Sequence, residues 1–285
     1  MRWILWFLLI SVVWAEAAPH RPVRCVRDRK AQLASFETAI TRFRHPQKGY
    51  TVDLVGAVHI GPKDYYDRLN REFSKYDAVL YELIADGSGG RPIPIAGAEG
   101  GADNPLAMVQ HGLGNMLGLD FQLDYVDYSP KNFIHADISP AEFQKSQAQR
   151  HESFAQLFLR SLSSGADTSP EAEKELEQVN MMSVFSHPSL ADRAHMRRFM
   201  ALMFNNPEQM IELLEGPGGG TILSVRNQKA LSVLGQELKR GRRKIAIFYG
   251  AAHMLDMEKR LVRDYGVQYK SQGWVPAWDL RLPTK

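Results

Sequence analysis

The sequence predicts an α/β protein that folds as one domain around a central sheet. Three features predict this fold: short apolar segments of strand length, amphipathic helical segments after them, and a strand–helix–strand order typical of parallel pairing. The 285 residues fit one domain, and a hydrophobic content of 44% supplies a sizeable core. We therefore expect residues 18–285 to form a single unit behind a separate N-terminal segment.

The first part of this domain is expected to begin with two strands and a turn. Residues 36–40 and 50–54 alternate in character, and a Pro/Gly turn at 45–49 separates them. A Gly-Pro pair at 61–62 opens a helix, because proline suits the first helical position. Three large side chains share one face of that helix: Tyr66, Leu69 and Phe73. The apolar run at 78–83 then reads as a buried strand.

The middle of the chain changes character. Residues 86–105 are rich in Gly and Pro and predict a surface loop, either a lid beside the strand that carries Glu82 or a linker. Residues 105–215 have mostly helical spacing and predict a helical insertion, with a capping box at 139–142. The Gly-rich run at 215–220 lacks the Lys-Ser/Thr ending of a phosphate loop, so we expect a hinge or linker.

The last part of the chain returns to alternating elements. Residues 222–238 predict a helix that Gly241 stops, and residues 244–249 predict a buried strand. A helix marked by apolar residues at 254, 257 and 261 follows, and residues 267–274 predict a closing strand.

The N-terminus has the pattern of a secretory signal peptide at residues 1–17. Arg2 precedes an apolar run at 3–14, and Ala15-Glu16-Ala17 forms a small-x-small cleavage site. We predict cleavage after Ala17 and export, so that the protein is periplasmic, attached to the cell envelope or secreted. The alternative is an uncleaved anchor, which would bring membrane contact, although the run falls short of the ~20 residues that span a bilayer.

Composition excludes some partners and site types. With 35 Lys and Arg against 32 Asp and Glu, the formal charge is +3, far from the excess of a nucleic-acid-binding protein. The basic cluster at 239–244 lacks interleaved aromatic residues, so we read it as a solvated helix end or as a contact for anionic lipid or polysaccharide. Because Cys25 is the single cysteine, any metal site must rely mainly on His and carboxylate ligands.

Two Gly-x-x-His motifs carry the candidate chemistry. Gly56-Ala57-Val58-His59 and Gly250-Ala251-Ala252-His253 each follow an apolar strand and precede an amphipathic helix. In a parallel sheet both histidines and Glu82 would converge at the carboxyl ends of the strands. Two imidazoles and a carboxylate suit Zn, Mn or Co, and a bound ion would activate water for hydrolysis. Without metal, Glu82 and a histidine would form a general acid/base pair.

These motifs resemble the TraB/GumN/Tiki family. The resemblance rests on residues 55–59, 77–82, 226–227 and 249–254 and covers roughly residues 50–85 and 220–275. It implies two related α/β halves around one cleft and a metal-dependent peptidase activity on peptide or protein substrates. It also implies that His59, Glu82 and His253 are the motif histidines and glutamate. Ala57 stands where many members have Thr, so a hydroxyl is absent there.

Arg226 matches the family's helical arginine and is expected to stabilise negative charge on a substrate or an oxyanion. Asn227 would help to orient it or face solvent. The other candidates have simpler structural explanations. Tyr66 and Tyr249 fit core positions, the segment 135–137 fits a turn, and His151 and His195 fit solvent-exposed helices.

The sequence thus predicts an exported metal-dependent hydrolase that acts on peptides. Two alternatives remain: a protein that binds a peptide or a metal without turnover, and an envelope scaffold whose helical insertion is the partner surface.

Overall fold

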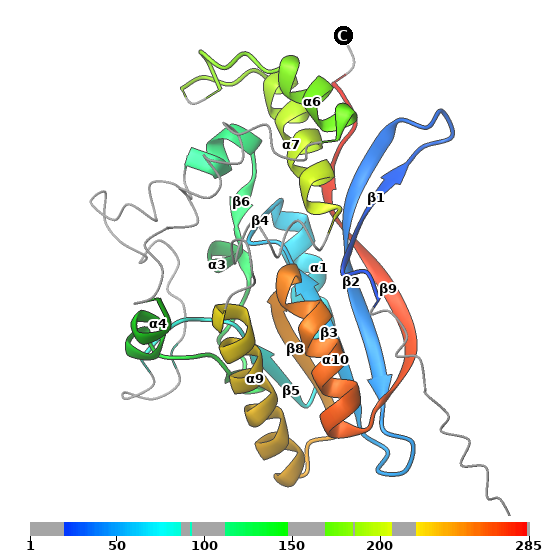
Figure 1. The fold of residues 1–285 in the computed structure, drawn as a ribbon, viewed down its shortest axis with the longest axis vertical. Helices are drawn as coiled ribbons and strands as arrows, with labels where there is room; N and C mark the ends of the chain where they lie inside the picture. The colour runs from blue at the N-terminus through cyan, green and yellow to red at the C-terminus, as the bar shows by residue number, and fades with distance from the viewer. Residues whose placement is uncertain are drawn as a thin grey trace, which may run out of the picture.

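The computed structural model describes residues 20–86, 92, 112–147, 169–184, 186–206 and 221–283. These residues form an α/β fold, as predicted, with a central mixed sheet of seven strands (Figure 1). The sheet contains β1 (Val23–Arg27), β2 (Leu33–Arg44), β3 (Thr51–Ala57), β5 (Ala78–Tyr81), β7 (Phe133–His135), β8 (Lys244–Gly250) and β9 (Gln268–Asp279).

The sheet has an antiparallel part and a parallel part. Its strand order is β1-β2-β3-β8-β5-β7, and β9 pairs with β2. β1, β3 and β9 each run antiparallel to β2, which confirms the predicted hairpin between β2 and β3. β3, β8, β5 and β7 are parallel. β8, which comes late in the sequence, lies between β3 and β5, so the two strands of the β3–α1–β5 unit are not neighbours in the sheet.

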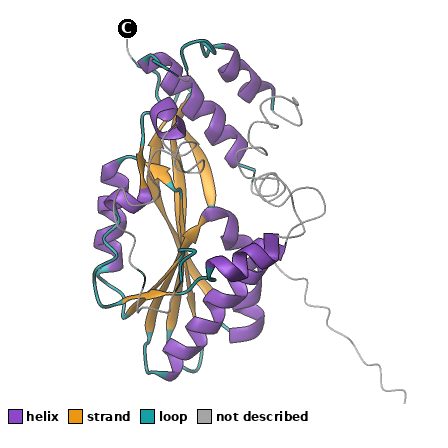
Figure 2. Cartoon of the chain, turned by 90° about the vertical axis from the view of Figure 1, so that its left-hand side faces the viewer, coloured by secondary structure: helices purple, strands orange, loops and turns teal. Residues whose placement is uncertain are grey.

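Helices cover both faces of this sheet (Figure 2). They are α1 (Lys63–Phe73), α3 (Gln122–Tyr125), α4 (Pro140–Gln147), α6 (Pro170–Glu177), α7 (Leu190–Phe204), α9 (Thr221–Lys239) and α10 (Met254–Tyr265), with a short 3-10 helix η1 (Ala251–His253). Residues 112–117 are also helical. β4 (Ile60–Gly61) and β6 (Asp120–Phe121) form a separate small antiparallel pair.

Two apolar cores lie on opposite faces of the sheet. In β8, Ala246 and Phe248 belong to the core that α1 and α7 cover, whereas Ile245, Ile247 and Tyr249 belong to the core under α9 and α10. Alternate side chains of a strand point to opposite faces, so an uninterrupted apolar run marks a strand buried on both sides.

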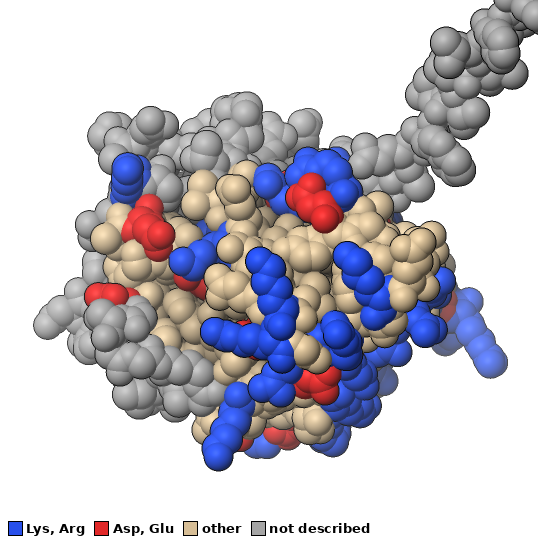
Figure 3. Space-filling model, turned by 90° about the horizontal axis from the view of Figure 1, so that it is seen from below, with Lys and Arg blue, Asp and Glu red and all other residues tan. Residues whose placement is uncertain are grey.

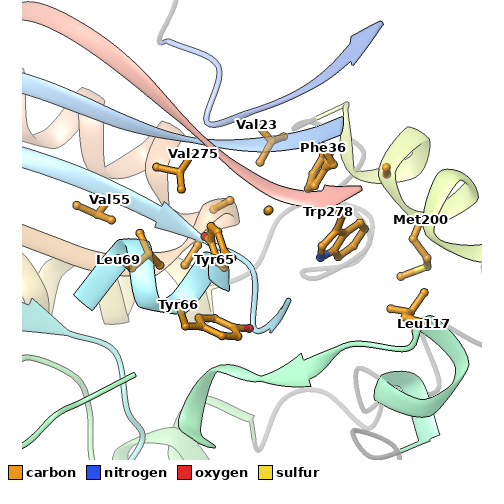
Figure 4. Close-up of a cluster of buried hydrophobic side chains, with 14 of the residues drawn as sticks. Val23, Phe36, Val55, Tyr65, Tyr66, Leu69, Leu117, Met200, Val275 and Trp278 are labelled. Atoms are coloured by element: carbon orange, nitrogen blue, oxygen red, sulfur yellow. The ribbon is translucent and has the colours of Figure 1, made fainter. Parts of the chain in front are cut away.

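Figure 4 shows the first of these cores. Tyr65 and Leu69 of α1 point into the same cluster as Val55 of β3. Phe36 and Trp278 bring β2 and β9 into it, with ring centroids 5.0 Å apart. The predicted apolar face of α1 is confirmed, because its large side chains are almost completely buried.

Several predicted elements need correction. The segment 105–215 is not only helical, because it contributes β7 to the central sheet and β6 to the small one. A strand of three residues is too short to show a period of two. β1 was missed in a stretch that reads as polar and basic, and β9 extends beyond the predicted 267–274. Both β1 and β9 are stabilised by antiparallel pairing with β2.

Some predictions fall on residues that the structure does not describe. They are the signal peptide at 1–17, most of the loop at 86–105, and the Gly-rich run at 215–220. Within the described ranges, no helix combines the length and the apolar content that crossing a membrane requires.

Candidate functional site

Four polar side chains follow strands that end at the same edge of the sheet. Because β3, β8, β5 and β7 are parallel, their carboxyl ends meet there. His59 comes shortly after β3, Glu82 directly follows β5, and His253 ends the turn η1 after β8. Asp137 comes shortly after β7. The topology therefore places the predicted residues at one edge, together with a carboxylate that was not predicted.

Glu82 occupies the centre of this group. Its Oε2 accepts a hydrogen bond from the backbone N–H of Gly250 at 2.7 Å. Its Oε1 lies 2.6 Å from Nη2 of Arg226 and 3.6 Å from Nε2 of His253. The side chain of Glu82 is only 9% exposed. Both oxygens are thus held in place, one by the last residue of β8 and the other by a guanidinium from α9.

Arg226 joins Glu82 to a second carboxylate. Its Nε donates to Oδ1 of Asp137 at 3.0 Å, and its Nη2 donates to Oδ2 at 2.5 Å. The side chain of Asp137 is completely buried, and that of Arg226 is 11% exposed. A two-pronged contact of this kind fixes the guanidinium plane. Asp137 therefore fixes the orientation of the Arg226 guanidinium that contacts Glu82.

The cluster carries one more negative than positive charge when its imidazoles are neutral, because two carboxylates face one guanidinium. Burial by itself raises the pKa of Glu82, but Arg226, His253 and His59 outweigh burial and hold this pKa well below its usual value. Glu82 is therefore ionised at neutral pH. The excess charge favours an additional cation at this place, such as an imidazolium, a metal ion or an ammonium group of a substrate.

Asn227 fixes the tautomer of His253. Its Nδ2 group donates to Oδ2 of Asp256 at 2.8 Å and to the carbonyl of His253 at 3.3 Å, so its Oδ1 must be the acceptor from Nδ1 of His253 at 2.6 Å. His253 therefore carries a proton on Nδ1. When the ring is neutral, the lone pair is on Nε2, the atom that faces Glu82.

The glycine that begins each Gly-x-x-His motif lies close to residues of the other motif. A Cβ on Gly250 would lie 3.0 Å from Nε2 of His59 and 3.5 Å from Oε2 of Glu82. A Cβ on Gly56 would lie 3.6 Å from Cα of Ala251. A side chain at Gly250 would crowd the histidine of the other motif, which gives a physical reason for glycine there. His59 is exposed, so it forms the solvent side of the site.

The donor set of the cluster has the chemistry of a divalent metal site. Two imidazoles and a carboxylate are suitable donors for Zn, Mn or Co. However, no group of three or more His, Cys, Asp or Glu side chains in the described part of the chain is arranged to hold a metal ion. Both oxygens of Glu82 are already engaged, one of them by the guanidinium of Arg226. A three-ligand site is therefore not preformed, and metal binding stays a prediction.

Two members of the cluster were misjudged from the sequence. The sequence favours a turn for the segment that contains Asp137, and it suggests Asn227 only as a partner of Arg226 or a solvent-facing residue. Asp137 instead anchors Arg226, and Asn227, which is fully buried, orients His253. A polar residue shortly after a strand was the available signal for Asp137, but β7 itself was not recognised.

The weaker candidates have structural roles. Tyr66 is fully buried, and its hydroxyl donates to the carbonyl of Val58, as expected for a core residue. Burial and the carboxylates of the cluster raise the pKa of Tyr249 well above its usual value, so its hydroxyl stays protonated and donates to the carbonyl of Ala136.

The three other candidate histidines, His135, His151 and His195, lie outside the cluster or outside the described residues. His135 contacts the carbonyl of Leu83 through Nε2 at 2.6 Å. The predicted exposure of His195 is wrong, because its side chain is 17% exposed and its Nδ1 lies 2.7 Å from Oε2 of Glu175. His151 lies outside the described residues.

Comparison with known proteins does not assign a family. No protein-family model matches the chain, and no curated protein matches it. The resemblance to the TraB/GumN/Tiki proteins therefore remains a prediction that rests on the motif residues.

Proposed function

We propose that this protein is an exported hydrolase that cleaves peptides at the carboxyl edge of its parallel strands. The observation that supports this most strongly is the meeting of Glu82, which follows β5, with Arg226 of α9 and His253 of η1. A buried, paired carboxylate beside an imidazole with a fixed tautomer is a common arrangement in general acid/base catalysis.

In this proposal each residue has a separate task. Nε2 of His253 takes a proton from the water whose oxygen attacks the peptide carbonyl carbon. The ionised Glu82 stabilises the imidazolium that forms. His59, on the solvent side, gives a proton to the departing amine as the carbon–nitrogen bond breaks. His253 then releases its proton to the solvent and His59 takes one up, so both imidazoles return to their starting forms.

Arg226 receives a different task from the one that the sequence suggested. Its guanidinium is shared by Glu82 and Asp137, so little of its charge is available for an oxyanion. We therefore assign it to positioning: it holds Glu82 ionised and in place. A divalent ion, when bound by His59, Glu82 and His253, would supply an activated water and polarise the carbonyl.

The test is hydrolysis of a fluorogenic peptide library by the purified chain, with EDTA or with added Mn, Co or Zn. We expect turnover that falls by about 10²–10⁴-fold in His253→Ala and in Glu82→Gln. His187→Ala is the matched control, because it removes an exposed histidine outside the cluster. Thermal melts of all variants separate lost chemistry from lost folding.

The outcomes distinguish the alternatives. Turnover that EDTA abolishes and one added ion restores would support the metal-dependent form of the proposal. Equal turnover in His253→Ala and the wild type would eliminate this site. Saturable binding of peptide or metal without any product would instead indicate a binding protein. A function in the cell that survives both substitutions would indicate a scaffold.

A further inference from the structure

The end of the molecule opposite the candidate site gathers basic side chains from four separate segments. These segments are 44–50, 72–77, 237–244 and 263–268, and we call them together the basic face. The segments are in contact: the N–H of Thr51, directly after the first segment, donates to the carbonyl of Arg243 at 2.8 Å, and the side-chain Oδ2 of Asp77 accepts from the N–H groups of Arg243 and Lys244. Arg44 is paired with Gln268 across β2 and β9. The basic face is thus one continuous surface at the amino ends of the parallel strands.

Charge is concentrated on this face far beyond the chain's average. The four segments contain nine Lys and Arg against four Asp and Glu, a net of +5, whereas the whole chain is +3. The rest of the chain is therefore net −2. Figure 3 views the molecule from this end and shows many Lys and Arg side chains on the described surface, with fewer acidic groups among them.

Of the four acidic groups of the basic face, Glu237 is turned inward, whereas Glu72, Asp77 and Asp264 are partly or fully exposed. The side chain of Glu237 is 2% exposed, whereas those of its partners Arg240 and Arg242 are 66% and 47% exposed. Asp77 uses an oxygen to accept two main-chain hydrogen bonds. A basic end of α9 would suit its helix dipole. However, this does not explain the cations that come from the β2–β3 turn and from the end of α1.

The start of the described chain lies beside the same end of the molecule. The ring of His20 stacks on Tyr269 with centroids 3.8 Å apart, and the backbone N–H of His20 donates to Oε2 of Glu258 at 3.0 Å. Tyr269 follows Gln268, which is paired with Arg44 at the edge of the basic face. The apolar run at 3–14 precedes His20 in the sequence by only a few residues.

We propose that the basic face binds the surface of an anionic lipid bilayer. Exposed Lys and Arg on the tips of separate turns form a broad surface rather than a groove, and such a surface suits the phosphate groups of lipids. An apolar N-terminal segment and a polybasic surface are two membrane signals that reinforce each other. When residues 1–17 are removed, the basic face remains as the binding element. In either form, the candidate site at the opposite end points away from the bilayer.

The test is flotation of the full chain with phosphatidylcholine vesicles, with and without phosphatidylglycerol. The test variant is Lys48→Gln/Lys239→Gln/Arg243→Gln. These three side chains are exposed, so we expect the fold to be retained. The matched control is Arg29→Gln/Lys30→Gln/Lys174→Gln, which removes the same charge from the β1–β2 turn and from α6. Thermal melts of both variants check that they are folded.

We expect the wild type and the control to bind the vesicles that contain phosphatidylglycerol, and added salt to weaken this binding. The test variant should bind about 100-fold more weakly, because each Lys or Arg near an anionic surface contributes about a five-fold increase in binding. Equal binding by the two variants would show that the basic face has no part in it, and failure of the wild type to bind would refute the proposal. Binding to soluble dextran sulfate but not to vesicles would assign the face to a polyanion instead.

Discussion

Replacing Arg226 by Met should expose how the buried charges depend on one another. The guanidinium is the only positive charge that the structure places within 2.6 Å of Glu82 and Asp137 among the described residues. Met has a similar length without charge, so the substitution leaves two buried carboxylates without their counter-charge. The side chain of Asp137 has no exposure, and that of Glu82 is 9% exposed, so water can compensate little.

The expected cost is about 3–5 kcal/mol in the free energy of unfolding, which is typical when one partner of a buried ion pair is removed. For a domain of this size that corresponds to a melting temperature lower by about 6–20 °C. The cost should also depend on pH. In the wild type the folded-state pKa of Glu82 lies below its usual value of 4.5, so its stabilising contribution is present above that value and is lost as the pH falls through the folded pKa.

Without Arg226 we expect the direction to reverse, because burial, which raises the pKa of Glu82, loses its largest opposing contribution and is then opposed by the histidines and the N–H of Gly250. A carboxyl group whose pKa is raised by folding stabilises the fold at low pH and loses that contribution as the pH rises. The variant should therefore be closer to the wild type at about pH 5 than at about pH 8, by about 1.4 kcal/mol for each unit of the pKa increase.

Urea unfolding of both proteins at the two pH values measures this difference. Arg263→Met is the control, since Arg263 is 66% exposed and pairs with its neighbour Asp264, and its loss should leave the unfolding curve unchanged. A deficit below about 1 kcal/mol at the higher pH, or one of equal size at both pH values, would show that the guanidinium does not stabilise these carboxylates.

Two further predictions concern the geometry around the histidines. Asn227→Ala removes the acceptor that fixes the tautomer of His253. We expect about 10–100-fold slower turnover, a shifted pH profile of turnover and a loss of about 1–3 kcal/mol in the free energy of unfolding. An unchanged pH profile would contradict this role. Gly250→Ala places a Cβ 3.0 Å from Nε2 of His59, so the exposed ring must move by a few tenths of an ångström. Peptide turnover should fall while the melting temperature stays nearly constant; equal losses of both would indicate a distorted backbone instead.

The sequence was sufficient for the elements whose side chains follow a clear pattern. β8 and β5 were recognised because strands buried on both faces are uninterrupted apolar runs. α1 and α10 were recognised because their apolar residues recur on one face. β1 and β7 were missed because each is stabilised by the strand beside it rather than by its own composition.

For the candidate site, local sequence indicated His59, Glu82 and His253, because each is a polar residue that follows an apolar strand. It could not indicate what those groups contact. Asp137 and Asn227 are short polar residues with ordinary neighbours, and their roles depend on partners 89 and 26 positions away in the chain. The tautomer of His253 and the ionisation of Glu82 are likewise properties of the assembled cluster.

The sequence by itself determined the fold class, the positions of the two Gly-x-x-His motifs and the formal charge, because composition and local periodicity record them directly. Only the tertiary structure decided that β8 lies between β3 and β5, and this arrangement places both motifs beside Glu82. It also decided that cations from four segments share one end of the molecule. The reason is that strand order and charge placement arise from contacts between distant residues, and no local pattern encodes those contacts.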